Sequence, residues 1–178
     1  MATGKAVREQ RPLRLVGLPP LVCAGTRLLV LGSFPGAASL AARQYYAHPR
    51  NQFWPILAAI WQESPDGICE DSYENRSDRM LAHGLGLWDV YRACEREGSL
   101  DSRIRNAEIN DFASLRVRCP ALQAVAHNGG ESFRHARALE SLGLPVVRLP
   151  STSPANASWR FERKLAAWRE VFARHGLA

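Results

Sequence analysis

Short apolar runs that end at a glycine or a turn alternate with helical segments along this chain, and this alternation constrains the fold most strongly. Residues 27–31 (RLLVL) form a continuous apolar run that ends at Gly32, as is typical of a buried strand in a parallel sheet. Further strands are predicted over residues 86–91, 121–126 and 145–149. The four segments predict the strands of one small sheet.

Helical segments separate and follow these strands. Helices are predicted over residues 37–46, over 52–62 with Pro55 in the first turn, and over 131–142, where Gly143 supplies a C-terminal cap. Residues 63–79 are polar and acidic and indicate a loop with a short helix. Near the C-terminus, apolar residues recur at helical spacing: Phe161, Leu165, Trp168 and Phe172. The alternation predicts an α/β fold of three α/β/α layers around a mostly parallel four-stranded sheet.

Composition is consistent with one globular domain over residues 1–178. Of the 178 residues, 46% are hydrophobic, and the polar residues 1–12 are expected to be a flexible segment. No apolar run approaches the ~20 residues of a membrane span, and the charged start lacks a signal core. We therefore expect a soluble, cytoplasmic protein, in the cytosol or nucleoid of a bacterium. The cysteines are isolated and form no C-x-x-C pair, so no metal or other cofactor is expected: Cys23, Cys69, Cys94 and Cys119.

The charge pattern suits a polyanionic partner. The net charge is +6, and residues 1–60 and 134–178 are both strongly basic, whereas residues 61–133 carry thirteen acidic and eight basic side chains. If both ends meet in the fold, they form a basic face of the kind that binds nucleic acid. The alternative is a GC-rich genome, since 21 of the 23 basic residues are arginine.

Loops that follow the predicted strands carry the candidate chemistry, because ligands of open α/β sheets bind beyond the carboxyl ends of the strands. In the first loop, residues 32–36 (GSFPG), backbone N–H groups could bind an anion or polarise water, although a plain strand-to-helix turn is the alternative. Residues 45–54 (YYAHPRNQFW) combine stacking aromatics with an amide, as a pocket for a planar base requires. Phe53 and Trp54 as core anchors, and Asn51 as a helix cap, are the alternatives.

Two later loops are rich in small polar residues. Residues 127–130 (HNGG) end a predicted strand, and Asn128 there is either functional or a simple turn residue. Residues 150–156 (PSTSPAN) place three hydroxyls between prolines, which suits phosphate binding without sequence preference. The alternative for this loop is a cap for the last helix, with Asn156 or Ser158 as the capping residue.

Taken in order, these segments resemble the uracil-DNA glycosylase superfamily. GSFPG resembles its G-x-N-P-G loop, HPRNQFW resembles the P-x-N-x-F-W segment of the mismatch-specific branch, and GLWDV falls where that branch ends a strand in a base-reading Asn. HNGG resembles its F-N-G turn, and LPSTSPAN its phosphate-binding loop. More narrowly, GSFPG, YYAHPRNQFW, GLWDVYRACEREGSL, NDF and LPSTSPAN are similar to the deoxyinosine (hypoxanthine)-DNA glycosylase family.

Two positions depart from the wider superfamily. Phe34 stands where most members have an Asn or Asp that orients the attacking water, and a phenyl ring cannot do this. The narrower family shares this loss, and the resemblance implies that Asn51 acts instead. Leu149 stands where the uracil-specific enzymes have a His, which argues against strong uracil activity.

The resemblance implies a monofunctional enzyme that flips deoxyinosine out of DNA and hydrolyses its N-glycosidic bond by water attack, as a monomer. Lys5 and Lys164 are the only lysines, and neither lies in a candidate loop, so no Schiff base is expected. The implied site comprises catalytic Asn51 and Ser33; base-binding Phe34, Phe53, Asp89 and Asn128; phosphate-binding Ser151, Thr152 and Ser153; and the pocket loop Gly32, Pro35 and Gly36.

Three other functions remain open at this point. A mismatch uracil or thymine glycosylase with a broad range of deaminated bases shares the fold and differs in substrate. Phe34 also permits a non-catalytic protein that binds damaged DNA. A nucleotide-binding module is disfavoured, since the chain lacks G-x-G-x-x-G and the Lys-Ser/Thr pair of a phosphate loop.

Overall fold

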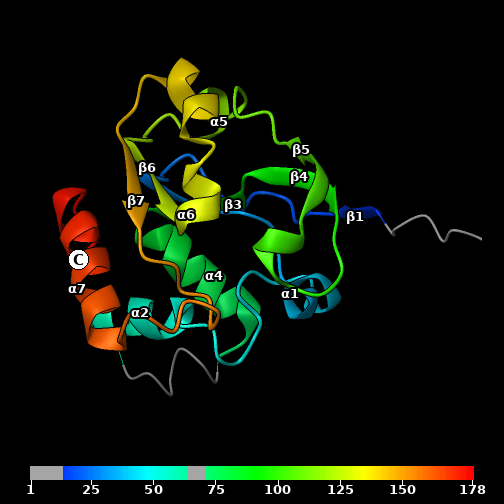
Figure 1. Ribbon diagram of the computed structural model, residues 1–178. Coiled ribbons are helices and arrows are strands. Elements are labelled where there is room, and N and C mark those ends of the chain that lie inside the picture. The colour runs from blue at the N-terminus through cyan, green and yellow to red at the C-terminus, as the bar shows by residue number, and fades with distance from the viewer. Residues whose placement is uncertain (1–13, 64–70) are drawn as a thin grey trace, which may run out of the picture.

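A four-stranded parallel sheet forms the centre of the computed structural model, which describes residues 14–63 and 71–178 (Figure 1). The strand order is β3-β2-β6-β7, and the strands are β2 (Leu28–Gly32), β3 (Leu85–Asp89), β6 (Ala124–Asn128) and β7 (Val146–Leu149). Gly32 pairs in register with Asp89, and Asn128 with Leu149, so these residues lie together at the carboxyl end of the sheet. The prediction of one small parallel sheet is confirmed.

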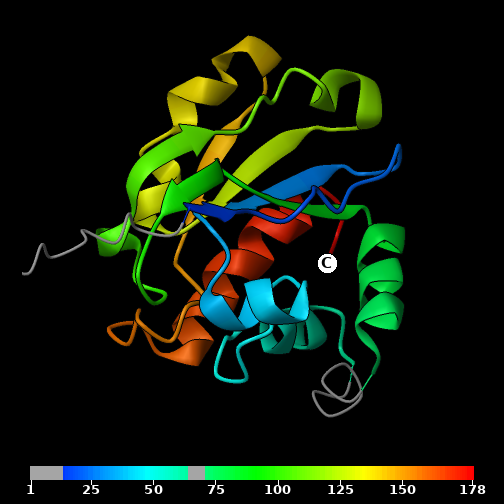
Figure 2. The same ribbon diagram turned by 90° about the vertical axis from the view of Figure 1, so that its right-hand side faces the viewer.

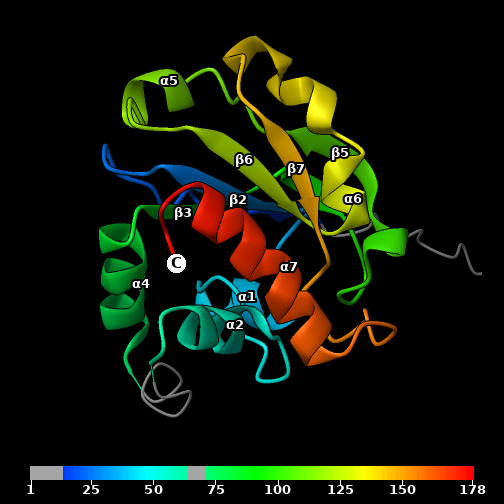
Figure 3. The ribbon, with the colours of Figure 1, turned by 90° about the vertical axis from the view of Figure 1, so that its left-hand side faces the viewer.

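Helices cover both faces of the sheet. Leu28 and Val30 pack into a core with α2 (Phe53–Ile60), α4 (Tyr73–Ala82) and α7 (Phe161–Arg174). Leu29 and Leu31 point to the other face, which is covered by α5 (Leu115–Arg118), α6 (Gly130–Phe133) and the 3-10 helix η2 (Ala136–Leu142). Figures 2 and 3 show α7 and the α5–η2 region on opposite sides of the sheet. Because successive side chains alternate between faces, one apolar strand supplies both cores, and the three α/β/α layers are confirmed.

A second sheet was not predicted. It is antiparallel, with the order β1-β4-β5, and consists of β1 (Arg14–Val16), β4 (Tyr91–Glu95) and β5 (Arg105–Ile109). β4 begins two residues after β3, so the predicted single strand over 86–91 is in fact the end of one strand and the start of another. The chain changes sheets at Val90, whose N–H donates to the Gly32 carbonyl (2.9 Å).

Several helix boundaries differ from the predictions. The helix predicted over 37–46 is α1 (Ala37–Ala42), since Arg43 takes a left-handed conformation (φ 54°) that ends it. The helix predicted over 131–142 is divided into α6 and η2. Within the segment 63–79, α4 begins at Tyr73 after Ser72, whose Oγ accepts from the Asn75 N–H. The amphipathic C-terminal helix and Pro55 in the first turn of α2 are confirmed.

Some expectations fall on parts of the chain that the structure does not describe. The predicted flexible segment 1–12, Cys69 and part of the acidic loop, residues 64–70, lie outside the described residues. Within residues 14–63 and 71–178, no helix has the length and apolar character to cross a membrane.

Candidate functional site

A pocket of about 890 Å³ lies at the carboxyl end of the parallel strands. It brings together the four loops singled out in the sequence, and the connection between β4 and β5 closes a further side. Its lining residues lie within 32–39, 45–51, 99–102, 128–130 and 148–156, together with Asp89, Trp159 and Ala167. Among the described residues, no group of three or more His, Cys, Asp and Glu side chains could hold a metal ion.

Asp89 lies in the floor of this pocket, against Gly32. A Cβ atom on Gly32 would overlap Asp89 Oδ1, so only glycine allows the carboxyl group this position at the end of the neighbouring strand. Asp89 is buried, and its Oδ2 has no hydrogen-bond partner among the described residues. Burial, with a smaller contribution from the negative charge of Asp101, raises the pKa of Asp89 to about 7. The carboxyl group therefore changes charge near neutral pH.

Tyr46 forms an aromatic wall of the pocket. Its ring stacks on Phe53 with centroids 4.1 Å apart, and its hydroxyl accepts from Asn128 Nδ2 (3.0 Å). Phe53 itself is fully buried and contacts Trp54 and Trp168 edge to face. The predicted base-stacking residue Phe53 thus lies behind Tyr46, and Tyr46 presents its ring to the pocket. Burial raises the pKa of Tyr46, so its hydroxyl keeps its proton.

Asn51 lies at the start of α2 with one end of its amide engaged. Its Oδ1 accepts from the Phe53 N–H (2.9 Å), and its own N–H donates to the His48 carbonyl (2.8 Å). No hydrogen bond to the described residues engages Nδ2. The N-cap residue of α2 is Gln52, not Asn51, so the capping alternative for Asn51 is wrong. Asn51 precedes it, and its bond to the Phe53 N–H uses the oxygen and leaves the NH₂ group for a ligand in the pocket.

Asn128 ties the loop after β7 to the sheet. Besides Tyr46, its Nδ2 donates to Thr152 Oγ1 (2.9 Å), and its Oδ1 accepts from the Thr152 N–H (2.9 Å). Thr152 is fully buried, and its carbonyl accepts from the Gln52 N–H (3.0 Å). The structure thus places Thr152 and Asn128 as anchors of this loop, with their side chains bonded to each other.

Ser151 and Ser153 remain half-exposed in the same loop. The Ser151 Oγ accepts from the Ser153 N–H, and the Ser153 Oγ accepts from the Ala155 N–H, both at 3.2 Å. Each hydroxyl hydrogen is left to donate outward. Of the three predicted phosphate-binding residues, these two have the geometry for that contact.

Buried groups on α7 hold the loop from beneath. Lys164 is buried, and its Nζ donates to Gln52 Oε1 (2.8 Å) and to the Asn156 carbonyl (3.0 Å). Trp168 Nε1 donates to the Pro150 carbonyl (3.0 Å). Burial lowers the pKa of Lys164, but its amine points into these contacts and it is not among the pocket-lining residues. The loop is therefore fixed before any ligand binds.

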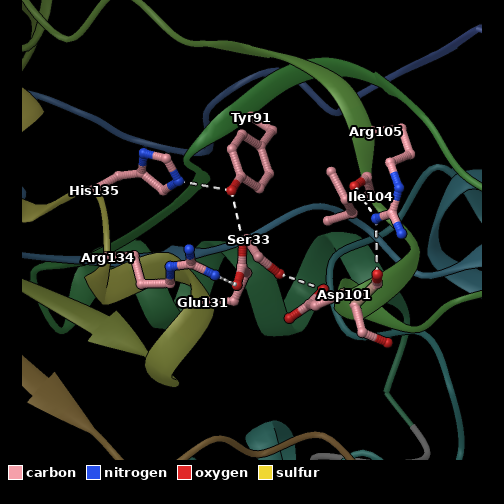
Figure 4. Close-up of polar contacts among 9 residues, drawn as sticks. Ser33, Tyr91, Asp101, Ile104, Arg105, Glu131, Arg134 and His135 are labelled. Carbon is pink, nitrogen blue, oxygen red and sulfur yellow. Dashed lines mark hydrogen bonds and ion pairs between the residues drawn. The ribbon is translucent and has the colours of Figure 1, made fainter.

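The first loop is held by the β4–β5 connection. Ser33 Oγ donates to Asp101 Oδ1 (2.8 Å), in the 3-10 helix η1 (Asp101–Arg103), as Figure 4 shows. The Ala37 N–H donates to Ser99 Oγ (2.9 Å), and Arg96 donates to the Pro35 carbonyl. These three contacts fix both ends and the middle of the loop.

Phe34 turns away from the pocket. Its ring is buried with Leu31 and Tyr91 on the far face of the sheet, and the guanidinium of Arg96 lies 5.0 Å from the ring centroid. Arg96 is itself 7% exposed. The ring of Phe34 therefore belongs to the core, although other atoms of the residue line the pocket, and its predicted base-binding role stays a prediction.

The structure brings most of the predicted site residues to one pocket: Gly32, Ser33, Phe34, Pro35, Gly36, Asn51, Asp89, Asn128, Ser151, Thr152 and Ser153. Phe53 lies one layer behind it. Sequence reasoning missed Tyr46 as a site residue, although the Tyr45-Tyr46 pair in the aromatic run was the available signal. The motif GLWDVYRACEREGSL covers residues 86–100, but no residue of the segment 96–101 was predicted to belong to the site, because this segment lies distant in sequence from the loop that it holds.

Comparison with known proteins agrees with this geometry. The family model for the uracil DNA glycosylase superfamily matches residues 19–172. A hypoxanthine DNA glycosylase of Methanosarcina barkeri is 39% identical over 158 residues, which cover 89% of this chain and 98% of the relative. A protein of the same name from Methanosarcina acetivorans is 35% identical, over 88% of this chain and 96% of its own length. A G/U mismatch-specific uracil DNA glycosylase of Schizosaccharomyces pombe is 31% identical, but over only 64% of this chain and 33% of the relative.

A solved structure supports the fold. The solution structure of a Methanosarcina acetivorans protein, provisionally assigned as a uracil DNA glycosylase, has a TM-score of 0.80 and 34% identity and covers 91% of this chain. The match covers 98% of the solved chain, and it agrees with the family resemblance of the sequence motifs. The chain therefore belongs to the uracil DNA glycosylase superfamily.

Proposed function

We propose that this protein is a monofunctional DNA glycosylase that removes hypoxanthine, the deamination product of adenine, from DNA. The observation that carries the proposal is its similarity to two proteins named hypoxanthine DNA glycosylase along nearly their whole lengths. The pocket supports it, because one fixed loop with free hydroxyl donors lies beside a site that contains an aromatic wall, an amide and a buried carboxyl group. The mismatch-specific relative matches a smaller part of the chain, which favours hypoxanthine over the mismatch alternative.

The target nucleotide must leave the base stack to reach this pocket, at a cost of a few kcal/mol. We propose that the flipped base stacks on the ring of Tyr46, which Phe53 supports from behind at 4.1 Å. Asp89 would then meet the edge of the base that carries N1–H and O6. A protonated carboxyl group presents one donor and one acceptor, which match O6 and N1–H, whereas a carboxylate accepts from N1–H and repels O6.

Cleavage needs electrostatic support more than covalent chemistry. The C1′–N9 bond breaks with positive charge on the sugar and negative charge on the departing base. Water then adds to C1′ and gives up a proton, and one proton neutralises the departed base. Asn51 Nδ2, which is free to donate, would bind the departing base or the attacking water. Ser33 would act through its backbone and through its bond to Asp101, which holds the first loop in place.

The DNA backbone would lie across the loop after β7. Ser151 and Ser153 would donate to the flanking phosphates, and the exposed Arg148 and Arg160 would add positive charge beside them. The amine of Lys164 is occupied by two acceptors beneath the loop, which agrees with hydrolysis that leaves the abasic site intact. We further propose that the protein acts as a monomer in the cytoplasm, as one domain.

A single-turnover assay tests the proposal. Oligonucleotides that contain deoxyinosine, deoxyuridine or deoxyxanthosine are treated in single-stranded form and opposite each base, with and without alkali. We expect the fastest cleavage with deoxyinosine, and only after alkali. A uracil-dominated profile would favour the mismatch alternative, and binding without turnover would favour the non-catalytic alternative. A covalent adduct trapped by borohydride would contradict the monofunctional mechanism.

The matching variant is Asn51→Ala. We expect its single-turnover rate on deoxyinosine to fall by about a hundredfold or more, as for other lost transition-state donors. Asn51→Asp is the control, since its carboxylate keeps an acceptor for the Phe53 N–H but has no NH₂ group. If both variants fold and Asn51→Ala retains the wild-type rate, Asn51 takes no part in the chemistry.

A further inference from the structure

Arg96 is a buried arginine that does not line the pocket. It follows β4 directly and belongs to the motif GLWDVYRACEREGSL. Its Nη2 donates to the Pro35 carbonyl, whereas Nε and Nη1 are buried and have no hydrogen-bond partner among the described residues. A guanidinium that is removed from water with two nitrogens unpaired is unfavourable, so its place in the fold needs a reason beyond one bond to the loop.

The positive charge of Arg96 acts on its surroundings through space. Burial lowers the pKa of Arg96, but a guanidinium starts far above neutrality and stays charged. In the described part of the chain, no carboxylate forms an ion pair with it. The carboxyl groups that feel its charge are those of Asp101 and Asp89.

Asp89 is the buried carboxyl group on which this charge acts. Burial raises the pKa of Asp89, the negative charge of Asp101 raises it further, and Arg96 lowers it, which leaves it at about 7. Tyr45 and Tyr46 also face Asp89, and burial and the charge of Asp89 raise their pKa values, so both hydroxyls stay neutral. Among the described groups that act on Asp89, only Arg96 therefore carries a positive charge.

The first pocket loop holds Arg96 in a fixed place relative to Asp89. Gly32, at the start of the loop, pairs with Asp89 across the strands and leaves room for its Oδ1. Three residues further along, the Pro35 carbonyl accepts from Arg96. The ring of Phe34 lies against the guanidinium, with 5.0 Å between its centroid and Cζ, and fixes the charge from a second direction. The loop itself therefore sets the position of the charge behind the pocket floor.

A donor to the departing base works best when its pKa lies close to the working pH, because it is then protonated and still a strong acid. Without Arg96, burial and the charge of Asp101 would keep Asp89 protonated to higher pH and make it a weaker donor. We propose that Arg96 is a positioning residue for the reaction, which holds the first loop at Pro35 and sets the pH at which Asp89 ionises. This inference rests on the proposed function, in which Asp89 binds the edge of the flipped base.

The first test follows the Asp89 carboxyl group in the absence of DNA. Aspartate labelled with ¹³C at the carboxyl group is incorporated, and the Asp89 signal, which is assigned by its loss in Asp89→Asn, is titrated by NMR. We expect a midpoint at about pH 7 in the wild type. In Arg96→Met and Arg96→Gln the midpoint should rise by about one pH unit, because an attractive charge is lost. Arg96→Lys keeps the charge and should titrate close to the wild type.

Two comparisons separate the charge of Arg96 from its structural part. Arg96→Gln keeps a donor for the Pro35 carbonyl, so it tests the charge alone and replaces Arg96→Met if that variant does not fold. Arg92→Met is the matched control, since Arg92 is exposed on the same strand, pairs with Glu108 and should leave the midpoint unchanged. A purely structural role predicts the opposite shift, because a loosened loop admits water and lowers the Asp89 midpoint towards its ordinary value. A midpoint that falls or does not move in Arg96→Gln would overturn the proposal.

The second test is the pH profile of the single-turnover rate on deoxyinosine. The wild-type rate should fall above about pH 7, where Asp89 loses its proton. In Arg96→Gln this fall should move to higher pH by the same interval as the carboxyl midpoint, and Arg96→Lys should restore the wild-type profile. A fall that stays in place while the midpoint rises would overturn the proposal. If the wild type cleaves no deoxyinosine, the proposed function is wrong, and the NMR midpoints still decide whether Arg96 controls the charge of Asp89.

Discussion

Asp89→Asn should make the protein more stable while it lowers the activity. In the folded protein, burial raises the pKa of this carboxyl group to about 7, whereas in the unfolded chain it returns to an ordinary value near 3.8. Between these two values the unfolded chain is ionised and the folded protein holds a proton. Asp89 therefore lowers the free energy of unfolding progressively as the pH rises through this window. The Asp89→Asn variant has no ionisable group at this position and should not show this decrease.

The magnitude follows from the two pKa values. Each pH unit inside the window changes the free energy of unfolding by about 1.4 kcal/mol, and the effect levels off above the folded pKa. Between pH 4.5 and pH 8 the advantage of Asp89→Asn over wild type should therefore grow by about 3 kcal/mol. The ionised carboxylate is unfavourable in the folded protein because the buried Oδ2 has no hydrogen-bond donor among the described residues.

Urea unfolding followed by tryptophan fluorescence measures this difference, with Trp88 next to the substitution. Asp78→Asn is the matched control, since it makes the same chemical change at an exposed position of α4 and should shift stability little at any pH. A stability difference between Asp89→Asn and wild type that stays constant from pH 4.5 to pH 8 would refute the reasoning. It would mean that Asp89 is solvated or paired in the native state.

Two further substitutions test other parts of the site. Tyr46→Ala should lower the single-turnover rate on deoxyinosine by about tenfold or more, because base stacking is lost. Tyr46→Phe keeps the ring on Phe53 and should lower the rate much less. Equal losses of rate in the two variants would assign the effect to the hydroxyl that binds Asn128. His127 is fully buried, and burial lowers its pKa to about 4. Between pH 6.5 and pH 4 the unfolded chain therefore binds a proton at this residue, whereas the folded protein keeps the imidazole neutral. Over this range the free energy of unfolding should fall by about 3 kcal/mol. His127→Asn should flatten that decline in a urea series, and an unchanged slope would locate the acid sensitivity elsewhere.

The parallel sheet could be predicted from the sequence because two of its strands bury every residue and a third buries all but its last. In β2 and β3 all five positions are buried, so composition alone reveals them. β5 (RNAEI) is mostly exposed and shows no alternation, since its place depends on the backbone of β4 and not on an apolar face. The second sheet therefore left no periodic signal.

The end of α1 could not be predicted for a related reason. Residues 37–46 have helical composition, but Arg43 and Tyr46 both adopt left-handed backbone conformations. These conformations are energetically unfavourable for residues other than glycine. Contacts distant in sequence hold this turn, among them the hydrogen bond from the Tyr45 N–H to the Tyr73 hydroxyl (3.1 Å). The turn brings Tyr46 onto Phe53, so the stacking wall of the pocket depends on contacts that local propensity does not contain.

Phe34 leaves the first loop without a polar side chain at the position where it stands. A side chain at this position that faced the pocket could bind water or base, but the ring of Phe34 packs into the far core beneath Arg96. The first loop then offers only its backbone, which Ser99, Asp101 and Arg96 hold from outside. We infer that the polar groups for the reaction come from one helix and one strand beside the loop: the free amide of Asn51 just before α2 and the buried carboxyl of Asp89 at the end of β3. Because these groups lie on rigid elements, the loss of a polar residue in the loop need not weaken catalysis.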